Sequence, residues 1–541
     1  MTTLDRKLAR DLYRAKGLLA AIIVIVSVGV LCLVALRSSY NNLVRSKADY
    51  YARCRMADFS VSLKKAPRPE ALRLIEIPGV STVHTRITFE VTVDLDETVE
   101  PLSGRVISLP DSPRPVLNDI VLRQGGYFTP MSRDEVIISD AFARAHDLKP
   151  GDSLRLILNN RKHELLIVGT AISSEFVYLI QPGELAPAPD RYGIFYLKES
   201  FAEEAYDFDG ACNEVLGRID PAHHPAPKPI EAEAERRLDD YGVFTVTPLS
   251  DQSSNKMLSD EITGLEAFAI FLPGLFLSVA ALVLNLLMMR LAEQQRTIVG
   301  TLKAIGYDNR AIILHFLKFA MVIGLIGGLL GVGLGYALAG YMTDLYATFY
   351  EFPRLVNQVY PSIWAISLFV SISFALLGTL RRVRSISHLQ PAEAMRQKPE
   401  ASGKAIFLER FAWLWRRLGF KMQMTLRYIW RHRTRTAVGA FAGSMGVALL
   451  LLSLASFDSM DHLIDFQFSK VLRSDYDLML SDEATDDAVR EALNLPGVDE
   501  AEPIFIVPCT LRHGRHERKF SIMGIKPEAR LTTPRTGDGV R

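Results

Sequence analysis

The sequence has few cysteines and almost no net charge. Its 541 residues carry a formal charge of +1, so bulk electrostatics predict no nucleic-acid partner. The four cysteines are Cys32, Cys54, Cys212 and Cys509, and they show neither a CxxC pair nor a metal-ligand spacing. Cys54 and Cys212 fall in one predicted domain and could pair, so the sequence leaves this disulfide open.

Signatures of catalysis are also missing. No GxxxxGK[ST] phosphate loop occurs, so we expect no bound cofactor and no ATP hydrolysis by this chain alone. No nucleophile–base pair stands out either, which predicts a protein that is not an enzyme. His223 and His224 are adjacent in a proline-rich loop at 221–229, where neighbouring side chains point apart and no further ligand is near. We therefore expect no metal site.

Long apolar runs, in contrast, are abundant. Each of five segments is long enough to cross roughly 30 Å of hydrocarbon as a helix: 17–36, 265–289, 319–342, 363–380 and 437–457. No Asp, Glu, Lys, Arg or His lies centrally in them, and Asn285 is the main polar exception. Ion-coupled carriers usually need buried ionisable groups, so this pattern disfavours that class.

Flanking charges predict how the chain is oriented. Five basic residues precede the first span: Arg6, Lys7, Arg10, Arg14 and Lys16. Arg381, Arg382 and Arg384 follow the fourth span. By the positive-inside rule, the N-terminus and the segment after the fourth span lie in the cytoplasm.

The segments between the spans complete the predicted domain order. They are a cytoplasmic surface helix at 1–16, an outer domain at 38–262, a cytoplasmic connecting helix at 290–318, a basic cytoplasmic linker with interfacial helices at 381–435, and a partial second outer domain at 458–541. Alternating apolar residues predict strands in the first outer domain at 59–63, 87–93 and 154–158. A helix at 69–75 makes this domain mixed α/β. The expected fold class is therefore a membrane α-helical protein with a large α/β outer domain and a partial second one.

The connecting segment at 290–318 has an amphipathic pattern. Ile298, Leu302 and Ile305 fall at i, i+4 and i+7 on one helix face, and Gly306 ends the helix. An apolar face between two membrane spans must be covered. A soluble partner could cover it, and the alternative is a solvated loop lying on the lipid headgroups.

The third span is rich in glycine. Gly324 and Gly328 are four residues apart, and so are Gly327, Gly331 and Gly335. Small residues at this spacing let helices approach closely in lipid. The two rows of glycines are consistent with a pair of helices that move against each other or with helices that are packed statically.

The chain repeats itself at an offset of about 417 residues, which fits a membrane protein built from two similar halves. RDLYR at 10–14 matches RYIWR at 427–431, and IPGV at 77–80 matches LPGV at 495–498. The second copy stops within its outer domain. We expect a truncated product that lacks three further spans and is inactive alone.

Several of these motifs together resemble one family. They are QRTIVGTLKAIGY at 295–307, the glycine-rich span, PAEAMR at 391–396, and one span plus three around a large outer domain. This combination is similar to the FtsX-like ABC transporter permeases, which include MacB-type exporters and lipoprotein-releasing Lol permeases. EVIISDAFARAHDLKPGDSLRL at 135–156 looks like part of a MacB-type periplasmic core.

The resemblance implies a multi-pass permease of the bacterial cytoplasmic (inner) membrane that works with a separate ATPase subunit, itself a dimer, which uses the ATP. The connecting helix would dock on that ATPase through Gln295, Arg296, Gly300, Leu302, Lys303, Ala304, Ile305 and Gly306. Many members carry an acidic residue two positions before the aligned Gly300. Ile298 stands there, so the role of that carboxylate is not transferred.

Two functions follow from the resemblance. The first is export or extraction of a lipoprotein, lipid-like molecule, peptide or drug at the outer face, with membrane lipids and a periplasmic adaptor as further partners. The second is a non-transporting relay that switches a periplasmic partner such as a cell-wall hydrolase. A neighbouring adaptor gene favours export, and a neighbouring hydrolase gene favours the relay.

Overall fold

The computed structural model describes residues 3–14, 16–95, 102–181, 187–222, 227–355, 357–387, 412–431, 433–478, 480, 484–513 and 516–536. The chain divides into two compact units, 1–419 and 420–541. Within the described residues, five helices are long and apolar enough to cross a membrane, and the first unit also holds an α/β sheet domain. The predicted fold class is therefore confirmed.

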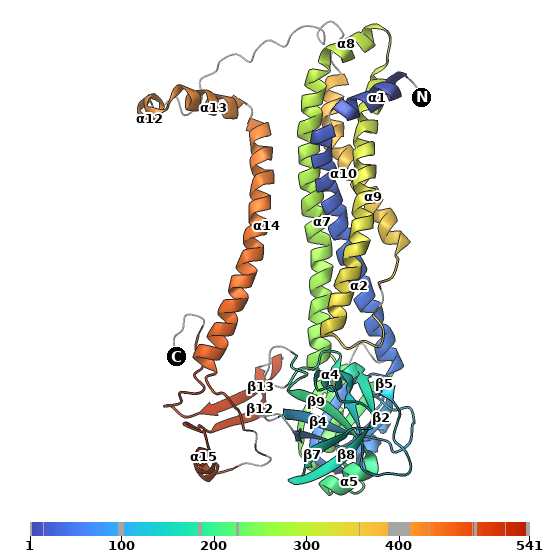
Figure 1. Ribbon diagram of the computed structural model, residues 1–541, viewed down its shortest axis with the longest axis vertical. Helices are drawn as coiled ribbons and strands as arrows, with labels where there is room; N and C mark the ends of the chain where they lie inside the picture. The colour runs from blue at the N-terminus through green and yellow to red at the C-terminus, as the bar shows by residue number, and fades with distance from the viewer. Residues whose placement is uncertain are drawn as a thin grey trace. The chain divides into compact units, whose positions relative to one another are not determined.

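Four long helices form the membrane bundle of the first unit (Figure 1). They are α2 (Lys16–Arg53), α7 (Ser253–Gln294), α9 (Asn309–Phe349) and α10 (Pro361–Ser387). Two short helices, α1 (Thr3–Arg14) and α8 (Arg296–Ala304), lie at the end of the bundle away from the sheet domain. A 42-residue helix such as α7 is about 63 Å long at 1.5 Å per residue. It is thus about twice as long as the roughly 30 Å apolar thickness requires.

These helices extend beyond their apolar stretches into two of the predicted segments. The connecting segment predicted at 290–318 contains the end of α7, all of α8 and the start of α9. The outer domain predicted at 38–262 includes helical stalks, namely the end of α2 and the first turns of α7. The charged residues there therefore lie on continuous helices.

The outer domain contains a four-stranded antiparallel sheet in the order β11-β1-β10-β2. Its strands are β1 (Phe59–Pro67), β2 (Val80–Arg86), β10 (Ala211–Ile219) and β11 (Val243–Pro248). Phe59, Val61 and Leu63 alternate into a core that α3 (Arg68–Leu72) and α6 (Pro227–Leu238) help to cover. The proline-rich loop predicted at 221–229 thus ends earlier, because proline is tolerated in the first turn of a helix. His223 and His224 lie outside the described residues.

The second sheet has seven strands in the order β5-β8-β6-β9-β4-β3-β7. They are β3 (Thr88–Asp94), β4 (Leu102–Leu109), β5 (Ile120–Gly125), β6 (Glu135–Ser139), β7 (Ser153–Leu158), β8 (Arg161–Ser173) and β9 (Tyr192–Lys198). Because β7 also pairs with β8, six of these strands close on themselves and β5 extends from β8. Two helices, α4 (Asp140–Ala145) and α5 (Glu199–Tyr206), follow β6 and β9.

All four cysteines are free thiols. Cys54 packs beside the membrane stalks, whereas Cys212 is buried in the core of the four-stranded sheet. The disulfide that the sequence left open is therefore not formed.

The second unit follows the order of the first. It has α13 (Phe420–Arg431), α14 (Arg433–Asp465), α15 (Asp486–Leu493) and an antiparallel pair of strands, β12 (Ile504–His513) and β13 (His516–Ile525). Gly79 and Gly497, from the two matching Pro-Gly-Val turns, both have positive φ, 99° and 86°. At the offset of about 417 residues, β12 and β13 fall at the positions of the antiparallel pair β3–β4. The structure thus supports the internal repeat.

Before that unit, α12 (Ala412–Arg417) covers part of the predicted basic linker. PAEAMR at 391–396 lies outside the described residues.

Candidate functional site

The short helix α8 makes a sharp elbow between α7 and α9. Gly306 has φ +100°, and its N–H bonds to the Lys303 carbonyl at 3.0 Å, which closes the helix where the sequence predicts. Asp308 then caps α9, since its carboxylate accepts a 2.6 Å hydrogen bond from the Asn309 N–H. The elbow is therefore set by local sequence signals.

The apolar residues of α8 divide into an anchored set and an exposed set. Val299 is only 3% exposed and Leu302 is partly buried, beside Ile312 and Phe316 of α9. Ile298 and Ile305, in contrast, are 45% and 71% exposed. Ile298 borders the same small pocket as Val299 and Leu302, so the predicted face holds for Ile298 and Leu302, whereas Ile305 lies apart from it. Ile305 lies past the last helical residue, and the spacing of Val299 and Leu302, three apart, marks the anchored side.

A polar trio joins the elbow to the surface helix α1. The Lys7 ammonium donates to Asp11 Oδ2 at 2.5 Å and to Gln295 Oε1 at 2.7 Å. The Gln295 amide in turn donates to Asp11 Oδ2 at 3.0 Å. Gln295, predicted to face a partner, is thus used within the chain. Sequence reasoning missed this contact because nothing local links residues almost 290 positions apart.

The other predicted elbow residues are spread over both sides of α8. Gly300 is buried and Lys303 is half-buried, while the Arg296 side chain lies outside the described part. The exposed surface of the elbow consists of Thr297, Ile298, Thr301, Ala304, Ile305 and Gly306. The large apolar side chains among these six residues are Ile298 and Ile305.

The two glycine rows of α9 contact two different helices. Gly327, Gly331 and Gly335 lie against α2, where an added Cβ would come within 2.6–2.8 Å of a valine. Those valines are Val26, Val30 and Val34. In the same contact, Ser27 Oγ of α2 donates to the Gly327 carbonyl at 3.0 Å, which holds the two backbones together.

The second row, Gly324 and Gly328, faces α10. An added Cβ on Gly328 would lie 2.7 Å from Leu368 Cδ1, and Ser371 Oγ donates to the Gly324 carbonyl at 2.8 Å. The polar exception Asn285 is also explained, because its amide donates to the Gly378 carbonyl at 2.8 Å. α9 is thus packed closely on both sides.

At the other end of the bundle, a buried arginine joins the two sheets of the outer domain. Arg86 of β2 donates two hydrogen bonds to Glu175, at 2.6 and 2.8 Å, and one to Glu214 of β10 at 2.6 Å. Burial alone would raise the pKa of Glu175, but the ion pair with Arg86 outweighs it and the pKa lies below its usual value. The Glu175 carbonyl also accepts a 2.6 Å bond from Gln252, just before α7. Arg86 and Glu175 therefore connect the two sheets with each other and with the start of α7.

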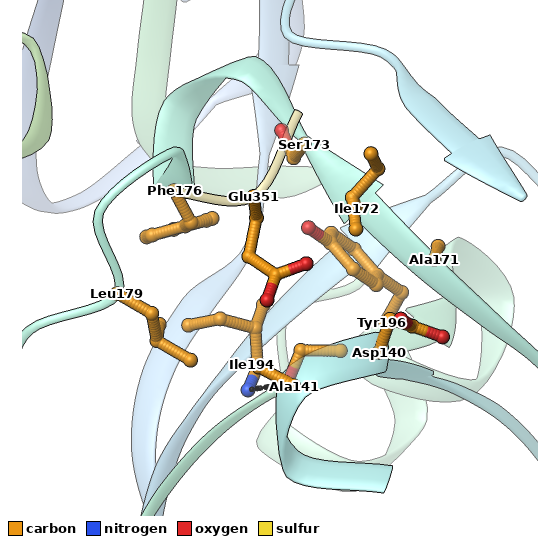
Figure 2. A pocket seen from close by; sticks show the side chains of 11 residues that line it. Asp140, Ala141, Ala171, Ile172, Ser173, Phe176, Leu179, Ile194, Tyr196 and Glu351 are labelled. Carbon is orange, nitrogen blue, oxygen red and sulfur yellow. Dashed lines mark hydrogen bonds between the residues drawn. The ribbon is translucent and has the colours of Figure 1, made fainter. Parts of the chain in front are cut away.

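A pocket of the outer domain lies where the segment after α9 touches it. Figure 2 shows Glu351 entering this pocket between Phe176, Ile194 and Tyr196. The cavity volume is about 10 Å³, enough for about one water molecule. This pocket is thus much smaller than a site for a drug-sized molecule.

Comparison with known proteins supports the permease assignment. Residues 270–391, from α7 to beyond α10, match the model of the FtsX-like permease C-terminal family. An uncharacterized ABC transporter permease, YvrN of Bacillus subtilis (strain 168), is 28% identical over 269 residues. That match covers 44% of this chain and 63% of the relative's length.

Two solved structures are similar to part of the chain. The periplasmic region of MacB from Actinobacillus actinomycetemcomitans aligns at 8% identity and TM-score 0.25, covering 38% of this chain and 92% of that one. The extracellular domain of the noncanonic ABC-type transporter YknZ from Gram-positive bacteria aligns at 14% identity and TM-score 0.24, covering 34% and 100%.

Proposed function

We propose that this chain couples a separate ATPase to a mechanical task at the outer face of the bacterial cytoplasmic membrane. The premise is that it carries an FtsX-like permease domain of the ABC transporter permease family. That work is export or extraction of a lipoprotein, a lipid-like molecule, a peptide or a drug. The chain binds no cofactor in this proposal, and ATP is used by the partner subunit. An ATPase dimer, membrane lipids and a periplasmic adaptor are its partners, with the N-terminus in the cytoplasm.

The exposed apolar surface of the elbow carries this proposal. Ile298 and Ile305 are open, while Val299 and the trio around Gln295 hold α8 firmly in place. A partner that pushes on Ile298 and Ile305 therefore pushes on an anchored helix. From α8, force passes into α7 and α9, and α7 is joined directly to the outer domain.

A non-transporting relay is the second candidate. It is favoured by the pocket of Figure 2, which has a cavity volume of only about 10 Å³. A relay needs a moving outer domain but no cargo cavity.

Co-purification tests the docking surface. Ile305→Asp places a charge on the exposed elbow, and we expect at least a tenfold loss of the ATP-hydrolysing subunit recovered with the tagged chain from native membranes. Ile75→Asp is the matched control, because Ile75 is similarly exposed but belongs to the outer domain. Undiminished recovery with Ile305→Asp would refute docking at the elbow.

Labelling tests the sidedness. A membrane-impermeant maleimide should reach Ile75→Cys in intact spheroplasts but reach Ile305→Cys only after permeabilisation. Equal labelling of both sites in intact spheroplasts would contradict the proposal.

A further inference from the structure

The segment that follows α9 is built into the outer domain although it does not belong to it. Residues 350–355, which we name the latch segment, connect α9 toward α10. The covalent connections to the outer domain are instead α2 and α7. Contacts of the latch segment are therefore a third, non-covalent link between the membrane bundle and the sheets.

Three separate parts of the outer domain hold the backbone and the carboxylate of the latch segment. The Glu351 N–H donates to the Val177 carbonyl at 2.8 Å. Arg123 of β5 donates to the Pro353 carbonyl at 2.9 Å and also to the Phe352 carbonyl. The guanidinium of Arg144, on α4, pairs with the Glu351 carboxylate.

Aromatic side chains bury the base of the same segment. Tyr350 and Phe352 are both nearly buried, in a cluster with Val177 and Leu258. The Phe352 ring lies 6.0 Å from that of Tyr50 on α2, and Tyr350 lies 5.3 Å from Tyr178. Side chains from a stalk, from the outer domain and from the latch segment thus share one core.

Glu351 lies between these two aromatic residues in the chain, and its side chain enters the pocket of Figure 2. Arg144 is held from its other side by Asp140, whose Oδ2 accepts its Nε–H at 3.1 Å. The Arg144 side chain is 58% exposed but the Glu351 side chain is only 17% exposed, so losing Arg144 would leave a mostly buried carboxylate without its cation. The latch segment is therefore held both by aromatic packing and by a partly buried ion pair.

We propose that the latch segment holds the outer domain directly on α9, with Glu351, Arg123 and Arg144 as the residues that position it. α9 begins at the elbow and ends at the latch segment, 41 residues or about 60 Å away. A role of the latch segment in transmitting motion rests on the proposed function. The contact between the latch segment and the outer domain does not depend on it.

Amide hydrogen exchange on the purified full chain tests the link. Glu351→Lys places an ammonium against Arg144 and should speed exchange about tenfold in two stretches, 350–355 and 172–178. Glu351→Gln keeps an acceptor for Arg144 and should stay within about threefold of the parent. Asp344→Lys is the matched control, because Asp344 is an exposed carboxylate on the last turns of α9, and it should change neither stretch.

The outcomes separate the alternatives. Faster exchange confined to 350–355 would mean that the loop merely rests on the surface, and faster exchange throughout both sheets would mean a general loss of stability. Either result overturns the latch. A bismaleimide joining Arg144→Cys to Glu351→Cys in the resting chain supplies a second measurement, and the absence of a cross-link between two reactive thiols also overturns it. Ile305→Asp tests the opposite end of α9, so the latch and the ATPase docking can fail independently.

Discussion

The two ends of the helix bundle are built differently. At the elbow, one polar trio and Val299 hold α8, and two large isoleucines stay open. At the outer junction, stalks, latch segment and sheets share an aromatic core, and the Tyr178 N–H donates to Ser254 Oγ of α7 at 2.9 Å. One end leaves apolar surface uncovered, while the other buries it.

Under the proposed function, this difference gives the two ends different roles. The outer junction is complete within the chain, so its residues should control the stability of the fold. The elbow leaves Ile298 and Ile305 exposed, so under the proposed function these residues should control association with the ATPase instead. Substitutions at the two ends should therefore separate stability from binding.

The largest effect on stability is expected from Arg86→Met. Removing the guanidinium leaves Glu175 and Glu214 buried without their cation, which costs about 3–5 kcal/mol. The measurement is thermal unfolding of the purified chain, with the exposed Arg236→Met of α6 as control. If both variants have the same unfolding temperature as the parent, the outer junction does not control stability.

A smaller loss is expected between the two ends, from Gly331→Leu. The new Cβ would meet Val30 at 2.6 Å and the Ser27 carbonyl at 2.7 Å, so overpacking should cost about 2–3 kcal/mol and lower the folded yield. Gly333→Leu on the same helix meets nothing within 4 Å and should be neutral. Equal yields by fluorescence-detected size-exclusion chromatography would argue against close packing of α2 on α9.

At the elbow, Asp11→Asn should cost only about 0.5–1 kcal/mol, because Lys7 and Asp11 are only partly buried. Its main result should be faster hydrogen exchange within α1. Arg10→Gln, an exposed change on the same helix, serves as control. If Asp11→Asn lost as much stability as Arg86→Met, the two ends would not differ in their control of stability.

The smallest effect at neutral pH belongs to His84 of β2. Burial and the positive charges of Arg86, Arg114 and Arg68 lower the pKa of His84 to about 4. As pH falls below about 6.5, the unfolded chain takes up this proton before the folded one, so stability is lost between about pH 6.5 and 4. His84→Gln should flatten that part of the melting curve against pH and change nothing at pH 7. An unchanged pH profile would mean that other groups dominate.

Much of the architecture follows from local patterns. Apolar runs without charge marked the spans, and alternation at Phe59, Val61 and Leu63 marked a strand. Gly306 marked the end of α8 because only a residue tolerant of positive φ fits there. Which side of α8 is covered was not predictable, because Val299 is buried in a cluster with Leu8 of α1 and Ile312 of α9, which local spacing cannot bring together.

By itself, the sequence determined the spans, the elbow, the two glycine rows and the internal repeat, since each depends on periodicity or on the conformational range of one residue. Only the tertiary structure decided that Gln295 faces Lys7 and Asp11, that the glycine rows contact two different helices, and that Glu351 reaches Arg144. These contacts join residues far apart in the chain, and their geometry exists only once the helices and sheets have packed.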